Sequence, residues 1–154
     1  FITHVPGMTT SVGGTTVTNS MKTLDAQRRE TERQLGKAGG LFSGWRVLVG
    51  DDAPAWSETF GDNSVLLPDA AIKGAPDLVR HSQGLKATSN GNPRLVLSAH
   101  SYGTEVAFYA LADRKHCFDT AVLSGSPGYP RTPVHLDRDD LYLATNPLMG
   151  LLHE

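Results

Sequence analysis

Residues 95–108 read LVLSAHSYGTEVAF, and their pattern indicates the class of fold. Its apolar run, Leu95 to Ala99, has the length of a buried strand. Apolar residues at helical spacing follow from Val106 to Leu111. The stretch therefore predicts a strand, a tight turn and a helix, with Ser101 in the turn.

The same alternation of strand and helix runs through the whole chain. Apolar runs predict strands at residues 1–5, 45–49, 95–99, 120–124 and 141–145. Helical spacing predicts helices over about residues 21–37 and 68–85, and a third directly after Ser101. This order predicts an α/β fold, a mostly parallel sheet with helices on both faces, as a single domain over residues 1–154.

Two of the helices carry more detailed expectations. The Gly/Thr/Ser-rich residues 9–20 are expected to form a loop, with Ser20 capping the helix that follows. Met21 and Leu24 fall near one face of that helix. Pro76 should kink the second helix or mark its true start, because proline cannot donate the backbone hydrogen bond of a helix interior.

Composition and charge narrow the class of protein. The formal net charge of −2 leaves no basic surplus to neutralise phosphates, which argues against a nucleic-acid partner. Arg28, Arg29 and Arg33 cluster, but Glu30 and Glu32 interleave with them, so a solvated helix face is expected there. The composition suits a soluble globular domain.

Three further absences bear on the class. Cys117 is the only cysteine, so no internal disulfide can form. Nothing reaches the run of about 18 apolar residues that predicts a membrane span. The chain opens on Phe1 without a signal-peptide pattern, and we expect it to be a processed product or an excerpt of a longer protein.

The turn around Ser101 has the pattern of a nucleophile elbow, small-x-Ser-x-small. Such a turn is strained and exposes the serine hydroxyl at the edge of the sheet, so the residues two before and two after must be small. Gly103 meets that need, and Ala99 meets it less well than glycine would. The alternative is a serine that merely caps the helix.

A nucleophilic serine also needs donors for the oxyanion that forms on the carbonyl. The Tyr102 amide lies at the positive end of the predicted helix and can donate one hydrogen bond. A second donor usually comes from the loop after an early strand, here Pro6-Gly7-Met8, which makes the Met8 amide the candidate. The alternative for Met8 is a plain turn that ends the strand.

A serine hydroxyl is activated by a base, usually histidine, that a carboxylate orients. Four of the six histidines are poor candidates for the base. His4 is expected to be packed or hydrogen-bonded on the first strand, and His100 to point away from the serine hydroxyl. His81 and His116 are expected at the surface.

The two remaining histidines follow the serine in the sequence. In this arrangement the order is serine, acid, histidine. His135 precedes the last predicted strand, which is too early, whereas His153 follows it. The base is therefore either His153 or a histidine further along a chain that stops here at Glu154.

Five short motifs together resemble a known family. They are Val5-Pro6-Gly7, Gly50-Asp51-Asp52-Ala53-Pro54, His100-Ser101-Tyr102-Gly103, Gly125-Ser126-Pro127-Gly128 and Thr145-Asn146-Pro147-Leu148. In this order they resemble an actinobacterial alpha/beta-hydrolase family, described as a domain of unknown function, with a Gly-His-Ser-Tyr-Gly elbow and a Gly-Ser-Pro-Gly turn. The resemblance implies an alpha/beta-hydrolase fold, truncated at its ends because the family's histidine segment lies beyond this chain.

The sequence departs from the family at several places. Ala99 stands where the family usually has glycine, and Leu48 and Asp51 stand where it has tryptophan and tyrosine. Asn146 stands at the expected position of the acid. Asparagine can orient a histidine but cannot stabilise an imidazolium, and the matching change in another Ser-His-Asp enzyme lowers turnover about ten-thousandfold.

Three acidic residues near the last strand do not fill the acid position. Asp137, Asp139 and Asp140 precede that strand, so they should emerge at the opposite edge of the sheet, as solvated or capping charges.

The residues and the resemblance lead to one principal hypothesis and two alternatives. The principal hypothesis is a serine esterase: Ser101 attacks a small-molecule ester, the Met8 and Tyr102 amides hold the oxyanion, His153 or a later histidine moves the proton, and Asn146 fills the acid position. The first alternative is a catalytically silent hydrolase-like domain that serves in binding or assembly. The second is an acyltransferase or thioesterase on the same scaffold. No metal or organic cofactor is expected, since no histidine or cysteine cluster has ligand spacing.

Overall fold

The computed structural model describes residues 1–7, 15–35, 45–47, 69–128 and 130–144. Five strands lie in the described part: β1 (Ile2–Val5), β2 (Trp45–Val47), β3 (Val96–His100), β4 (Thr120–Ser124) and β5 (Leu141–Ala144). The helices there are α1 (Thr15–Leu35), α2 (Asp69–Thr88) and α3 (Gly103–Ala112), with a 3-10 turn, η2 (Arg138–Asp140), before β5. All five predicted strands and three helices are therefore present.

The strands form one parallel sheet in the order β2-β1-β3-β4-β5. The chain runs from β1 outward to β2, then crosses back over β1 to β3 and continues to β4 and β5 on the other side. The order thus reverses between β1 and β3. In open parallel sheets, the crevice at the carboxyl ends of the strands beside such a reversal is the usual place for a binding site.

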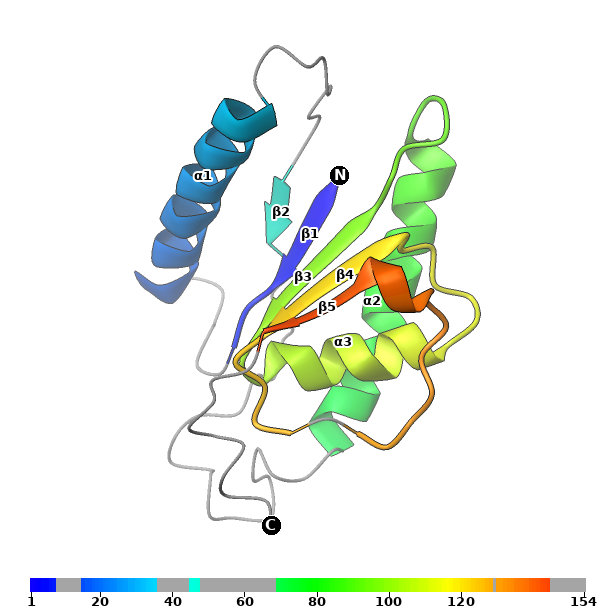
Figure 1. The fold of residues 1–154 in the computed structure, drawn as a ribbon. Coiled ribbons are helices and arrows are strands. Elements are labelled where there is room, and N and C mark those ends of the chain that lie inside the picture. Colours follow the sequence, from blue (N-terminus) through cyan, green and yellow to red (C-terminus); the bar gives the residue numbers. More distant parts are fainter. Residues whose placement is uncertain (8–14, 36–44, 48–68, 129, 145–154) are drawn as a thin grey trace.

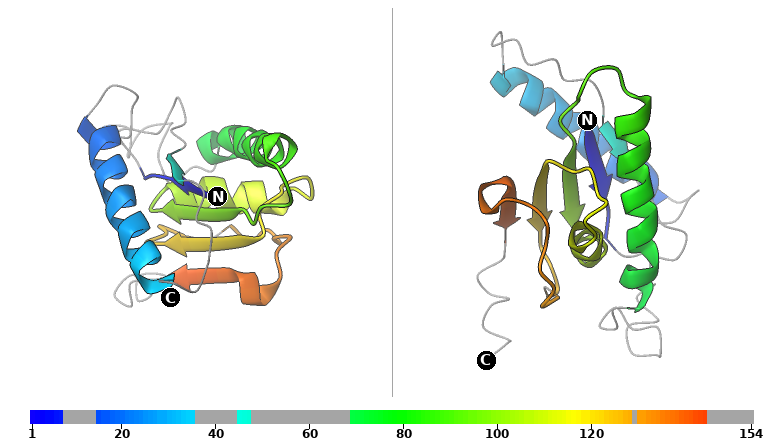
Figure 2. Two further views of the ribbon diagram at one scale, coloured as in Figure 1. Left: turned by 90° about the horizontal axis from the view of Figure 1, so that it is seen from above. Right: turned by 90° about the vertical axis from the view of Figure 1, so that its right-hand side faces the viewer.

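Helices cover both faces of the sheet, as the alternation of elements predicted. Figures 1 and 2 show α1 on one face and α2 with α3 on the other. The α2 and α3 helices also pack on one another. A helix lies between β1 and β2, between β2 and β3, and between β3 and β4, which is the arrangement expected for an α/β fold, whereas the described part of the connection from β4 to β5 holds only the 3-10 turn η2.

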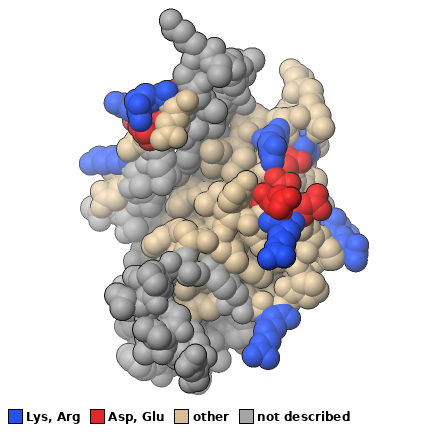
Figure 3. All heavy atoms as spheres, in the orientation of Figure 1, with Lys and Arg blue, Asp and Glu red and all other residues tan. Residues whose placement is uncertain are grey.

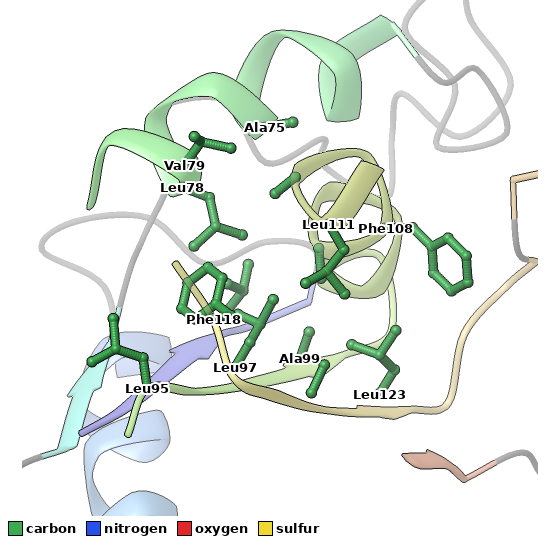
Figure 4. Close-up of a cluster of buried hydrophobic side chains, with 14 of the residues drawn as sticks. Ala75, Leu78, Val79, Leu95, Leu97, Ala99, Phe108, Leu111, Phe118 and Leu123 are labelled. Atoms are coloured by element: carbon green, nitrogen blue, oxygen red, sulfur yellow. The ribbon is translucent and has the colours of Figure 1, made fainter. Parts of the chain in front are cut away.

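The main core lies between the sheet and the α2/α3 layer, as Figure 4 shows. Alternate residues of β3 and β4 point into it: Leu97 and Ala99 from β3, and Ala121 and Leu123 from β4, each at most 1% exposed. The two helices pack against these strands through buried side chains, among them Leu78 of α2 and Leu111 of α3.

Polar contacts fix the amino ends of the central strands, opposite the predicted site. The Asp119 carboxylate accepts hydrogen bonds from the Leu95 amide at 2.7 Å and from Lys86 Nζ at 3.3 Å. Arg94 donates to the Thr120 hydroxyl and to Asp140 at 2.8 and 2.6 Å. These contacts hold the starts of β3 and β4 and the end of η2 together at this edge.

Two expectations for α1 are wrong. The helix begins at Thr15 rather than near Met21, so part of the predicted loop is helical and Ser20 lies inside the helix instead of capping it. Leu24 is buried, but Met21 is 59% exposed. Threonine and serine are only moderately poor helix formers, so a polar first turn extends the helix without an apolar stripe to reveal it.

The charged face of α1 is as expected. Arg28 pairs with Asp25 and Glu32 at 2.9 and 2.8 Å, and Arg33 pairs with Glu30 at 2.6 Å. These pairs are one helical turn apart and largely exposed, so they form a solvated surface.

One of the two expectations for Pro76, that it marks the true start of the helix, is wrong. α2 runs from Asp69 to Thr88 with Pro76 inside it. Residues on both sides of the proline, such as Ala71 and Leu78, are completely buried. Their packing outweighs the hydrogen bond that proline removes from the helix.

Within the described residues, no helix is long and apolar enough to cross a membrane.

Candidate active site

Ser101 lies in a strained turn between β3 and α3. Its φ is +54°, and it is the one non-glycine residue with positive φ in the described part of the chain. Residues other than glycine rarely adopt this left-handed backbone conformation, so the surrounding structure must hold Ser101 in it. The Ser101 amide donates to the Ser124 carbonyl at 2.9 Å, and the Ser101 carbonyl accepts from the Thr104 amide and hydroxyl at 2.9 and 2.7 Å.

These bonds bear on the alternative that Ser101 caps α3. A capping serine uses its hydroxyl to accept an amide of the first helical turn. Here the Ser101 backbone carbonyl takes the Thr104 amide, and the Tyr102 carbonyl takes the Glu105 amide. The amides of the first turn of α3 are thus bonded to backbone carbonyls, and α3 has no side-chain cap.

Close backbone contact explains the small residues around the turn. A Cβ on Gly103 would lie 2.5 Å from the carbonyl oxygens of both Val5 and Pro6. A Cβ on Gly7 would lie 2.9 Å from Ser101 Cβ and 3.4 Å from its Oγ. The loop after β1 and the elbow after β3 are therefore in contact, and only glycine fits at both points. Ala99, at 1% exposure, is accommodated inside the core.

The structure describes one of the two predicted oxyanion donors, Tyr102. Tyr102 follows the serine directly and precedes the first residue of α3, so its amide lies at the positive end of that helix. Met8 lies outside the described residues, but its neighbour Gly7 contacts Ser101.

The Tyr102 side chain packs away from solvent. Its ring lies against Ala71 of α2, and its hydroxyl has no hydrogen-bond partner in the described part of the chain. Burial, together with the nearby Glu105 carboxylate, raises the pKa of Tyr102 to about 12. Burial also raises the pKa of Glu105 to about 7. The side chains that follow Ser101 thus lie in a poorly solvated environment.

The histidines of β1 and α2 are engaged elsewhere. His4 Nδ1 and the Ser98 hydroxyl are hydrogen-bonded at 3.1 Å, as expected for a packed histidine. Burial, and to a lesser degree the charge of His100, lower the pKa of His4. The expectation that His81 is a surface residue is wrong: it is half-buried, and its Nε2 is 3.1 Å from the Thr3 hydroxyl.

His100 and the turn after β4 lie side by side. His100 is exposed, and its Nε2 is 3.2 Å from the position that a Cβ on Gly125 would take. The ring of His100, the residue before Ser101, therefore lies against the Gly-Ser-Pro-Gly turn.

His116 and His135 lie at the opposite end of the sheet. His116 Nε2 donates to the His135 carbonyl at 2.9 Å, and His116 Nδ1 accepts from the Phe118 amide at 3.2 Å. The expectation of a surface His116 is therefore wrong, because both of its ring nitrogens are used in a half-buried position.

The acid and base positions predicted from the sequence, Asn146 and His153, lie outside the described residues. The end of β5 is nonetheless placed: the Gly125 amide donates to the Ala144 carbonyl at 3.0 Å. Asn146 follows Ala144 by two residues, so β5 leads toward the same edge as the elbow.

The three aspartates before β5 lie at the amino-end edge, as predicted. Asp137 and Asp139 are exposed, and Asp140 pairs with Arg94. Asp137 and Asp140, with Lys86 and Asp119, help to line a cleft of about 730 Å³ at this edge. Figure 3 shows positive and negative side chains intermixed there. The cleft lies away from Ser101, so it is separate from the proposed site. Its cations Lys86 and Arg94 are paired with Asp119 and Asp140.

Sequence reasoning missed two contributors to the site. Ser124 supplies the carbonyl that binds the Ser101 amide, and no side-chain pattern announces a backbone acceptor. Glu105 had a signal that could have been used, since it is the one charged residue in the apolar helix sequence GTEVAFYALA. No group of three or more potential metal ligands is present within the described ranges.

Comparison with known proteins agrees with this geometry. A family described as alpha/beta hydrolase matches residues 2–147, nearly the whole chain. No curated protein matches the chain. No solved structure matches it either.

Proposed function

The chain belongs to an alpha/beta hydrolase family, and we propose that it is a serine hydrolase that cleaves carboxylic esters through Ser101. One observation carries the proposal: the left-handed φ of Ser101 in a strand-to-helix turn at the carboxyl edge of the sheet. This conformation is costly for a serine, and such strain is typical of positions where a side chain must be presented to a substrate.

The proposed reaction proceeds through an acyl-enzyme. Ser101 Oγ bonds to the ester carbonyl carbon while a histidine takes the hydroxyl proton. The carbonyl oxygen becomes an oxyanion, which the Tyr102 and Met8 amides stabilise. The C–O bond to the alcohol then breaks, and the histidine returns the proton to the departing alkoxide. Water hydrolyses the acyl-enzyme by the same steps in reverse order.

The base and acid are assigned from the sequence. The base is His153 or a histidine later in the protein, and Asn146 occupies the acid position. An asparagine there supports slower turnover than an aspartate, because it cannot stabilise the imidazolium that forms during attack.

Ester turnover tests this function. We expect p-nitrophenyl esters to be hydrolysed by the full-length protein, and Ser101→Ala to lower kcat/KM by about a thousandfold or more. Ser98→Ala is the matched control, because the Ser98 hydroxyl is also hydrogen-bonded to a histidine, His4, but Ser98 lies within the regular strand β3 rather than in the turn. Unchanged turnover in Ser101→Ala would exclude Ser101 as the nucleophile. Thioester and acyl-acceptor substrates assayed in parallel distinguish an esterase from a thioesterase or acyltransferase.

A catalytically silent binding domain is the second candidate, and Asn146 at the acid position favours it. A fluorophosphonate probe separates the two, because it reacts only with an activated serine. Labelling of the full-length protein that disappears in Ser101→Ala supports the enzyme. Absence of labelling supports the silent domain.

A further inference from the structure

The dipeptide Ser124-Gly125 joins the elbow to the strand that leads to the acid position. The Ser124 carbonyl accepts the Ser101 amide at 2.9 Å on one side. On the other side the Gly125 amide donates to the Ala144 carbonyl at 3.0 Å. Two adjacent residues thus hold the backbone of the nucleophile and the last residue of β5.

Gly125 has a conformation that other residues rarely adopt. Its φ is +61°, directly after the regular strand β4 ends at Ser124. A Cβ at this position would also lie 3.2 Å from His100 Nε2 and 3.5 Å from His100 Cδ2. Backbone conformation and the neighbouring ring therefore both favour glycine, and the ring belongs to the residue before Ser101.

We propose that Gly125 is a positioning residue: its left-handed turn beside His100 sets the spacing between Ser101 and the end of β5. The inference rests on the proposed serine chemistry, for which that spacing matters. Gly125 itself touches neither the substrate nor the reacting atoms. It acts through the Ser124 carbonyl on Ser101 and through its own amide on Ala144.

A side chain at position 125 should change turnover more than substrate binding. Relief of the strained φ requires the turn to move, and both hydrogen bonds move with it, whereas the contact with the exposed His100 ring needs a shift of only a few tenths of an ångström. Small displacements between a nucleophile and its partners lower the rate steeply, by up to about a hundredfold for about 1 Å. Binding of the acyl group depends on other surfaces, so KM should change little.

The test compares alanine at two left-handed glycines. Gly91 has φ +77°, and no atom lies within 4 Å of the position that an added Cβ would take. Gly91→Ala therefore has the conformational cost of a left-handed alanine but lies away from the proposed active site. We expect Gly125→Ala to lower kcat for p-nitrophenyl ester hydrolysis about tenfold or more relative to Gly91→Ala, with KM within about twofold. Equal kcat in the two variants, at equal folded fraction by circular dichroism, overturns the proposal.

Two further variants keep the test decisive if Gly125→Ala folds poorly. Gly125→Asn places a residue that tolerates the left-handed conformation, and it should recover part of the lost kcat. His100→Ala combined with Gly125→Ala removes the ring contact and should also recover kcat relative to Gly125→Ala alone. No recovery in either variant, when both are folded, contradicts the proposal.

The failure of this inference differs from the failure of the proposed function. If the wild-type protein neither hydrolyses esters nor reacts with a fluorophosphonate, the serine chemistry is wrong and the positioning role falls with it. If the wild-type protein is active and the two alanine variants are equal, only the role of Gly125 is wrong.

Discussion

The backbone around Ser101 limits which residue types fit at single positions of this turn. Ser101 adopts a left-handed conformation that costs an L-residue about 1–2 kcal/mol. Three surrounding contacts hold it there: the Ser124 carbonyl on its amide, Thr104 on its carbonyl, and Gly7 against its side chain. The strain is therefore maintained by neighbours from β4, α3 and the loop after β1.

Gly103→Ala should disrupt this arrangement. Its Cβ would lie 2.5 Å from two backbone oxygens, which cannot rotate away as a side chain could. We expect a loss of about 2 kcal/mol or more in the free energy of unfolding, measured by urea denaturation. Gly84→Ala is the matched control, because it lies in α2 with nothing within 4 Å and should stabilise the protein by up to about 1 kcal/mol. Similar effects of the two substitutions would contradict the close approach.

Tyr102→Phe should separate the amide of Tyr102 from its side chain. The buried hydroxyl lacks a partner among the described residues, so its removal should leave the free energy of unfolding unchanged or raise it by about 1 kcal/mol. Ester turnover should stay within about twofold, because the proposed oxyanion donor is the backbone amide. A loss of more than tenfold in kcat at unchanged stability would show that the hydroxyl takes part.

For single residues, the sequence predicts where small side chains are required, but it does not predict pKa values or hydrogen-bond partners. The small residues at 99 and 103 predict the turn at Ser101 because an elbow imposes that pattern on the chain itself. The raised pKa of Glu105 depends on which residues bury it, and residue type alone does not carry that information. The partners of His81 and His116 are likewise set by elements distant in the sequence.

Among the elements, α3 combines an apolar composition with one ionisable side chain, Glu105. The pKa of its carboxyl is about 7 in the folded protein, against an ordinary value of 4.5. Between these two values the folded state holds the proton more tightly than the unfolded state. Stability from this group is therefore present at low pH and falls as the pH rises toward 7.

Glu105→Gln should remove that dependence. We expect the Tm of Glu105→Gln minus that of the wild type to grow between pH 5 and pH 7 and to stay constant above. Glu30→Gln is the control, because Glu30 is exposed on α1 and its pKa is lowered by Arg33, so it does not titrate in this range. The same Tm difference for Glu105→Gln at pH 5 and pH 8 would contradict the burial of this carboxyl.

The ends of elements illustrate where sequence patterns stop being informative. The bounds predicted for β4, Thr120 to Ser124, agree with the structure, because a short apolar run, Ala121 to Leu123, lies at the centre of this strand. The start of α1 was missed by six residues, because its first turns are polar and their helical state leaves no periodic signal. The continuity of α2 through Pro76 depends on tertiary packing, which no local rule includes.

For the whole molecule, stability should depend on the layer between the sheet and α2/α3. Leu97 lies at its centre and is completely buried, whereas Leu143 on the edge strand is 48% exposed. Leu97→Ala should lower the free energy of unfolding by about 2–5 kcal/mol, and Leu143→Ala by well under half as much. Equal losses in urea denaturation would show that the core lies elsewhere.

The global arrangement was predictable because alternating strands and helices admit few topologies. Parallel strands need crossover helices, and those helices must cover both faces. The strand order was not predictable in this way: the reversal between β1 and β3, which brings Gly7 against Ser101, emerges only from the assembled sheet.

The claim that Ser101 is an activated nucleophile is tested most directly by mapping where a fluorophosphonate reacts. The full-length protein is treated with the probe and digested, and the modified peptide is sequenced by mass spectrometry. We expect one adduct, on Ser101. An unmodified Ser101, or an adduct on another serine such as Ser98 or Ser126, would contradict it.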